Sequence, residues 1–90
     1  MTTTQQHSEE IEMLRTEIEM LMTERRGLLR AAGAAAIFVA ELDSSVLPEN
    51  TYTPADLLAH ALNDLPEETL RDALEIVRPE IESASGSDSE

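Results

Sequence analysis

One group of side chains has a spacing suited to metal or acid–base chemistry: Asp56, His60 and Asp64. Residues four apart share a face of a helix, so the imidazole would lie between two carboxylates. Such a group could bind a divalent cation or shift the pKa of the histidine. Asp56 also suits the first turn of a helix, and Asp64 suits a position just before the next one. We therefore interpret His60 as an exposed, solvated side chain and assign no metal site.

Other catalytic groups are missing from the sequence. It contains no Cys, no Lys and no glycine-rich loop, which excludes a thiolate nucleophile, a Schiff base and the usual phosphate-binding loop. A pocket of about 300 Å³ or more, the usual size of a ligand site, is also hard to form in 90 residues. We expect a protein without enzymatic activity and without a cofactor.

The strongest pattern in the sequence is a heptad stripe. From Ile11 to Leu42, apolar residues recur at alternating steps of three and four, with Arg25 at one of the core positions. A repeat of 3.5 residues is typical of a seam along which two helices pair. The predicted oligomer seam consists of Ile11, Leu14, Ile18, Leu21, Met22, Arg25, Leu28 and Leu29. We expect a homodimer, and the sequence leaves parallel and antiparallel pairing open.

Arg25 has two interpretations within this seam. In a dimer its charge would reach water along its aliphatic stem, or pair with Glu24 of a second copy. Alternatively, the helix kinks or splays near Gly27, and Arg25 is simply exposed. Polar core residues of the first kind fix register or orientation at a cost in stability.

The elements needed to position these residues are all helical. A long helix is predicted over 8–43, with Ser8 as N-cap, a stalk over 8–30 and a head core over 31–43. A loop at 44–52 leads to two short helices in 53–82, which begin at Thr53-Pro54 and Pro66-Glu67. Pro79 is expected to end or bend the last helix. Residues 1–7 and the acidic segment 83–90 are predicted to be disordered.

Residues 31–40 are apolar nearly all round the helix, so this part should be buried on all sides. The small side chains there, with Gly33, would allow neighbouring helices to approach closely. The predicted head core consists of Ala32, Ala35, Phe38, Val39, Leu42, Leu58, Leu62, Leu70, Leu74 and Val77. The fold class is therefore all-α: a long coiled-coil-like helix followed by two short helices that form a small head, as a dimeric bundle.

The charge is strongly acidic. The chain has 19 acidic and six basic residues and a net charge of −13, which disfavours direct binding to nucleic acid or to anionic membranes. The acidity either provides solubility or presents a surface to a basic partner. The candidate partner surface consists of Met13, Met20, Asp56, Glu67, Glu68, Asp72 and Glu75, since adjustable Met side chains often serve at interfaces.

The location and function follow as expectations. The first residues lack the basic start and apolar centre of a signal peptide, and the apolar stretch 31–40 is shorter than the roughly 20 residues that span a bilayer. We expect a soluble cytoplasmic protein that acts as a non-enzymatic protein–protein interaction module (adaptor, chaperone or inhibitor) and self-associates through its first helix. Alternatives are an acidic nucleic-acid mimic that inhibits a DNA- or RNA-binding protein, and a structural subunit of a larger assembly.

Overall fold

The computed structural model describes residues 2–88, and these form three helices and two short 3₁₀ turns. The elements are α1 (Thr2–Glu41), η1 (Ser44–Val46), η2 (Glu49–Thr51), α2 (Tyr52–Asn63) and α3 (Glu67–Asp88). No strand occurs among these residues, so the predicted all-α fold class, with a long first helix followed by shorter ones, is confirmed.

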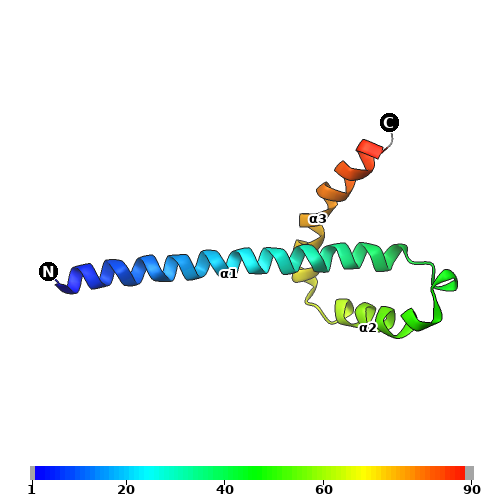
Figure 1. Cartoon of the computed structure of the whole chain (residues 1–90), viewed down its shortest axis with the longest axis horizontal. Coiled ribbons are helices and arrows are strands. Elements are labelled where there is room, and N and C mark those ends of the chain that lie inside the picture. Colours follow the sequence, from blue (N-terminus) through cyan, green and yellow to red (C-terminus); the bar gives the residue numbers. More distant parts are fainter. Residues whose placement is uncertain (1, 89–90) are drawn as a thin grey trace.

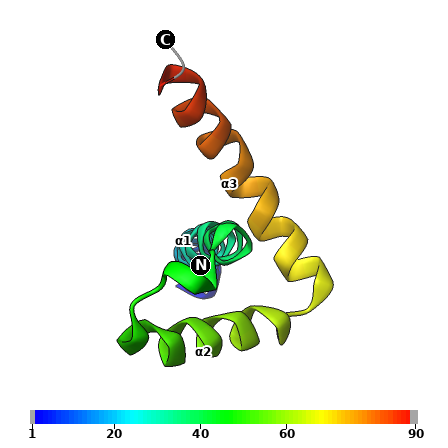
Figure 2. The ribbon, with the colours of Figure 1, turned by 90° about the vertical axis from the view of Figure 1, so that its right-hand side faces the viewer.

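The molecule is elongated because α1 extends far beyond the other helices. At about 1.5 Å per residue, its 40 residues span about 60 Å, and the whole chain measures 69 × 37 × 23 Å. The two later helices contact only the C-terminal half of α1 (Figure 1). The view along α1 shows α2 and α3 on different sides of it (Figure 2). The N-terminal half therefore projects alone.

Helix α1 begins earlier than the sequence predicts. It starts at Thr2, and Ser8, the predicted N-cap, lies inside the helix. The prediction of a disordered segment is thus wrong for residues 2–7, and Met1 lies outside the described residues. The physical reason is that no Gly or Pro interrupts this segment, and extending an existing helix is far easier than nucleating a new one. Further along, Thr16 and Thr23 donate hydrogen bonds to the carbonyls of Glu12 and Glu19, four residues back.

The connection between α1 and α2 is capped by its own side chains. Asp43 Oδ1 accepts hydrogen bonds from the backbone N–H and the hydroxyl of Ser45, at 3.0 and 2.6 Å. The Thr51 hydroxyl donates to the carbonyl of Pro48 at 2.6 Å. Helix α2 then begins at Tyr52, one residue before the start at Thr53-Pro54 that the sequence predicts. The 3₁₀ turn η2 directly precedes α2, so the backbone is already helical before residue 53.

Helix α3 starts at Glu67, as predicted from the preceding proline, but it ends much later than expected. It continues through Pro79 to Asp88, so the prediction of a disordered tail is wrong for residues 83–88. Ser89 and Glu90 lie outside the described residues. Pro79 is exposed, and water can therefore satisfy the carbonyl that loses its hydrogen bond to the missing proline N–H.

The core is a single close crossing between α1 and α3. Leu29, Ala73 and Val77 are buried, with Leu29 only 6% exposed, and Gly33 is buried among them. A Cβ atom built on Gly33 would lie 2.8 Å from the Ala73 carbonyl carbon and 2.9 Å from Val77 Cγ2, and would also collide with the carbonyl oxygen of Ala73. The two helices can approach this closely because residue 33 has no side chain.

The predicted head core is only partly packed in the single chain. Val77 is buried, whereas Phe38 is 60% exposed, so its assignment to the core is wrong for the isolated chain. The remaining predicted core residues are half-buried: Ala32, Ala35, Val39, Leu42, Leu58, Leu62, Leu70 and Leu74.

A bidentate ion pair between Arg30 of α1 and Glu80 of α3 connects the two helices beside the crossing. The Nε and Nη2 atoms of Arg30 donate to the carboxylate of Glu80 at distances of 2.9 to 3.1 Å, which is the bidentate geometry that favours Arg. These hydrogen bonds hold the pKa of Glu80 below its ordinary value, with the charge of Arg30 adding a smaller effect. They also raise the pKa of Arg30.

This pair predicts a specific pH dependence. Because the folded-state pKa of Glu80 is depressed, the pair stabilises the folded chain above the ordinary pKa of about 4.5, and this contribution is lost as pH falls through the folded-state value. Denaturant unfolding at pH 7 and at pH 3 should therefore show a smaller pH effect in Glu80→Gln than in the natural chain. Glu82→Gln, which removes a charge from the same helix, serves as the control and should not reduce the pH effect as much.

Candidate functional site

The surface that the heptad pattern predicts is exposed along a projecting part of α1. From here on the stalk is residues 4–24, in place of the predicted range 8–30. Residue 4 is the first whose side chain the structure describes, and Arg25 is the first residue of α1 that forms an ion pair with α3. Five predicted seam residues of the stalk, Met22 among them, are exposed. The four at the a and d heptad positions form what we call the stalk stripe: Ile11, Leu14, Ile18 and Leu21. Ile11, Leu14 and Ile18 also line one shallow groove with the side chains of Arg15 and Glu19. The stalk therefore presents an uncovered, continuous apolar strip.

In the single chain, Arg25 forms an ion pair with α3, and its predicted role in a dimer seam stays a prediction. Its Nη2 atom lies 3.7 Å from Oδ2 of Asp72 on α3, and both side chains remain partly exposed. The α1 helix continues unbroken through Gly27, so no break of the helix accounts for the exposure of Arg25. The contact between α1 and α3 therefore begins at Arg25. The sequence predicted that the head core starts later, at residue 31.

The last residues of the predicted seam are divided between two environments. Leu29 is buried under α3, whereas the neighbouring Leu28 is 73% exposed, and Met22 is exposed at the end of the stalk. Leu29 was assigned to the oligomer seam but packs within the chain. The sequence signal that could have revealed this is the spacing of Ala73 and Val77, which present a narrow face to Gly33. No local signal predicts the pairing of Arg30 with Glu80, since the two residues are far apart in sequence.

The acidic residues of the candidate partner surface do not gather on one unpaired face. Three of them pair with basic side chains in the head: Asp56 with His60, Glu67 with Arg71 and Asp72 with Arg25. Glu68 and Glu75 are exposed on α3. The set is divided between α2 and α3, so the structure adds no support to the nucleic-acid-mimic hypothesis, which stays a prediction.

Met13 and Met20 are exposed on the stalk, at 64% and 62%. Both occupy a heptad position outside the a and d positions, so they lie off the stalk stripe on the helical wheel. Their exposure is close to that of Leu21, also 62%. Exposure alone therefore does not distinguish the two faces of the stalk; the heptad spacing does.

The group at Asp56, His60 and Asp64 is engaged locally. His60 Nδ1 lies 2.8 Å from the carbonyl oxygen of Asp56 and 3.6 Å from its carboxylate. Asp64 forms the end of α2, with its backbone N–H bonded to the carbonyl of His60 at 3.0 Å. In the part of the chain whose side chains are described, residues 4–85, no group of three or more His, Cys, Asp or Glu side chains is arranged to bind a metal ion.

The same contacts raise the pKa of His60. The hydrogen bond to the Asp56 carbonyl is the larger cause, and the charge of the Asp56 carboxylate adds to it. Both favour the protonated ring, so they stabilise the folded state fully below the ordinary pKa of 6.5, and this effect is lost as pH rises through the folded-state pKa. NMR titration should therefore place the pKa of His60 above 6.5. In Asp56→Asn it should fall only part of the way, because the carbonyl remains; a value unchanged by this substitution would contradict the assigned causes.

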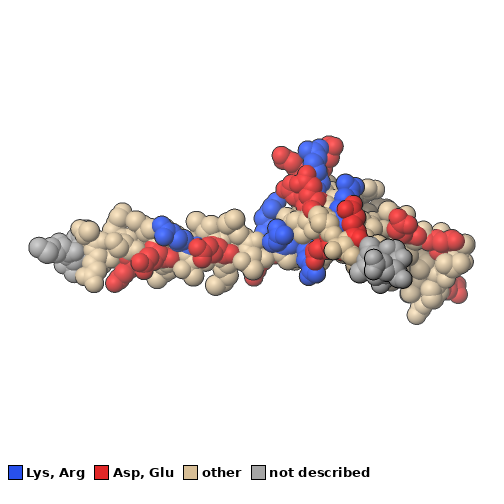
Figure 3. Space-filling model, turned by 90° about the horizontal axis from the view of Figure 1, so that it is seen from above, with Lys and Arg blue, Asp and Glu red and all other residues tan. Residues whose placement is uncertain are grey.

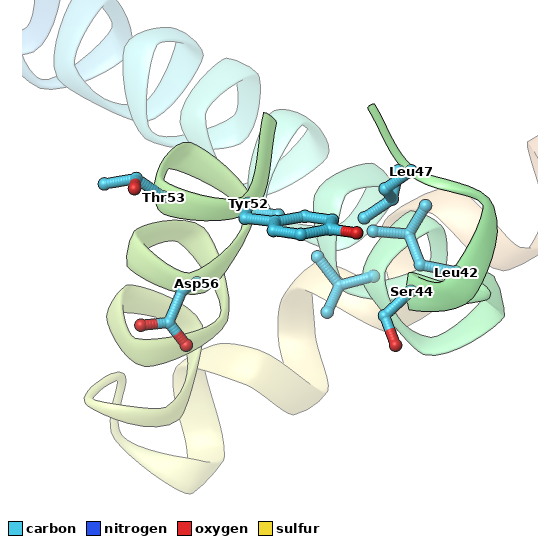
Figure 4. A pocket seen from close by; sticks show the side chains of 8 residues that line it. Leu42, Ser44, Leu47, Tyr52, Thr53 and Asp56 are labelled. Atoms are coloured by element: carbon cyan, nitrogen blue, oxygen red, sulfur yellow. The ribbon is translucent and has the colours of Figure 1, made fainter. Parts of the chain in front are cut away.

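A pocket of about 540 Å³, larger than expected for a chain of this length, lies where α1 leads through the 3₁₀ turns into α2. The ring of Tyr52 extends from the start of α2 toward Leu42 and Leu47 (Figure 4). Ser44, Thr53 and Asp56 provide polar atoms in the lining, but the Asp56 carboxylate is near His60 on its own helix. The pocket therefore offers mainly apolar contact surface.

Comparisons of the chain with models of known protein families, with characterised proteins and with solved structures gave no match. Among the helices in the described part of the chain, none combines the length and the apolar character required to cross a membrane. The functional interpretation therefore depends on the geometry of the stalk and of the head.

Proposed function

We propose that this protein is a non-enzymatic protein–protein interaction module that self-associates through its stalk. As an adaptor, chaperone or inhibitor, it would act by covering the surface of a partner protein. The observation behind the proposal is the stalk stripe: Ile11, Leu14, Ile18 and Leu21 have the spacing of a helix-pairing seam and are all exposed.

The amount of exposed surface supports association. The chain exposes 7632 Å², whereas a compact protein of 9.9 kDa would expose about 5,200 Å². The difference is about 2,400 Å², and a standard stable interface buries about 800 Å² on each partner. A chain of this shape therefore has ample surface for a second helix to cover.

The stability of the stalk supports the same proposal. Most of the stability of a helix in a protein comes from packing of its apolar face, and isolated helices of about 15 residues are marginal in water. Within the described residues, the stalk has no contact of this kind with α2 or α3 beyond its last turn (Figure 1). A paired stalk would gain the packing that the single chain does not provide.

Analytical ultracentrifugation and light scattering on the full chain test the proposal. We expect a dimer at micromolar concentrations that dissociates on dilution, together with loss of helicity as the stalk separates. A monomer across the micromolar range that retains full helicity would overturn self-association. Location in the cytoplasm belongs to the same proposal, and imaging of the tagged chain in its source cell would test it.

A further inference from the structure

The flanks of the stalk stripe are acidic. Glu10, Glu17 and Glu24 follow one another at intervals of seven residues, on the g positions directly beside the stripe. On the opposite flank, Arg15 lies between Glu12 and Glu19. In the view from above, acidic side chains recur along the projecting part of the molecule, with basic side chains concentrated near the head (Figure 3). The stalk stripe is thus an apolar strip bordered by carboxylates.

The basic residues of the head do not neutralise these carboxylates. Arg25 pairs with Asp72, and Arg30 pairs with Glu80, so both side chains point to α3. Among the side chains that the structure describes, residues 4–85, none of the ion pairs includes a glutamate of the stalk. The negative charge beside the stripe is therefore available to an approaching helix.

A second copy of the chain matches this charge poorly. In a parallel pair, g positions face the following e positions of the other helix. Glu10 would then meet Arg15, but Glu17 would meet Met22, and Glu24 would meet Leu29, which is already buried under α3. In an antiparallel pair, g positions face each other, so glutamates would oppose glutamates. Self-association through the stripe thus leaves most of the acidic flank unmatched.

A basic helix matches the same surface well. A helix with apolar residues at a and d and Lys or Arg at e and g would set a cation opposite Glu10, Glu17 and Glu24. The long stems of Lys and Arg would also cover the apolar edge of the stripe. Charged pairs at these positions determine which helices pair with each other.

We propose that the preferred partner of the stalk is a basic amphipathic helix of another protein, which replaces the second copy on the stalk stripe. This inference rests on the proposed function, because it uses the same apolar surface. Self-association then covers the stripe only while the partner is absent.

A pair of synthetic peptides tests the inference on the full chain. Each has 21 residues with Ile at a and Leu at d; one has Lys at every e and g position, and the other has Glu there. Fluorescence anisotropy in about 150 mM salt should give a Kd at least tenfold lower for the basic peptide. Raising the salt concentration should reduce this difference, because it depends on Coulomb attraction. Equal affinities, or no binding of either peptide, would overturn the inference.

Two triple variants test the position of the charge. Replacing Glu10, Glu17 and Glu24 by Gln should remove most of the tenfold preference for the basic peptide while leaving the dimer as stable or more stable. The control replaces Glu49, Glu68 and Glu75, which are exposed outside the stalk, by Gln. It changes the net charge equally and should keep the preference. If both variants lose it equally, general charge rather than the stalk flank is responsible, and the inference fails.

The outcomes also separate the inference from the proposed function. Leu21→Glu should weaken both the dimer and the binding of the basic peptide, because the two share the stalk stripe. A dimer that Leu21→Glu disrupts, combined with peptide affinities that do not depend on peptide charge, would overturn the inference and leave self-association intact. An oligomer that Leu21→Glu leaves unchanged would instead overturn self-association through the stripe.

Discussion

Leu21→Glu is expected to convert the associated protein into monomers at micromolar concentrations. Burying one leucine side chain contributes about 1.5–3 kcal/mol, and a symmetric dimer loses two such contacts and gains two charges in an apolar seam. The dimer should weaken by a factor on the order of 100 or more. Sedimentation velocity over a range of concentrations measures the change directly.

Met20→Glu is the matched control for this experiment. The two side chains are neighbours on the stalk and equally exposed, at 62%, and both substitutions add one negative charge. Only Leu21 belongs to the stalk stripe, so Met20→Glu should change the dissociation constant by no more than a few-fold. Equal weakening by the two substitutions would mean that net charge, not the heptad seam, controls association.

Replacing the two glycines of α1 by alanine should change stability in opposite directions. At Gly33 the added methyl group would lie 2.8 Å from the Ala73 carbonyl carbon. Such overpacking against backbone costs about 1–3 kcal/mol, which offsets and exceeds the helix-propensity gain of alanine. Gly33→Ala should therefore lower Tm, and a net loss of 1 kcal/mol corresponds to about 4–8 °C for a domain of this size.

Gly27→Ala provides the comparison within the same helix. No atom lies within 4 Å of a Cβ built at this position, so alanine gains about 0.5–1 kcal/mol from its helix propensity without a clash. Its Tm should rise by several degrees. Thermal unfolding followed by circular dichroism at one fixed protomer concentration measures both variants, since association also shifts Tm. A Gly33→Ala chain as stable as Gly27→Ala would contradict the close crossing of α1 and α3.

The sequence predicted the class and order of the helices but not how long each one is. The start of α3 followed from Pro66 and the acids after it, and the long first helix followed from the absence of proline before Pro48. The errors concern Ser8 and Pro79, whose local preferences favour helix ends. In both places the helix continues. The N-cap preference of Ser8 is only about 1 kcal/mol and is outweighed by the extension of an existing helix. The cost of a proline inside a helix is larger, about 3 kcal/mol, and it is reduced at Pro79 because water reaches this exposed position.

The candidate surface could be predicted only in its first half. The exposed residues Ile11 to Leu21 follow the heptad pattern, whereas Arg25 and Leu29 are drawn into contact with α3. Such contacts depend on where two segments distant in sequence meet. The same limit explains the exposure of Phe38: an apolar position of α1 is buried only if another helix reaches that side.

The continuity of α1 determines where the two heads of a dimer lie relative to each other. Because one unbroken helix of about 60 Å joins the stalk to the head, pairing through the stalk fixes the spacing between the two heads. Parallel stalks would bring them side by side, and antiparallel stalks would hold them at opposite ends of a rod. A target with two sites at the matching distance would then be held with far higher avidity than a target with one site. Energy transfer between dyes attached at residue 57, on the exposed face of α2, would distinguish the two arrangements. Parallel stalks should give a short distance between the dyes, and antiparallel stalks a long one.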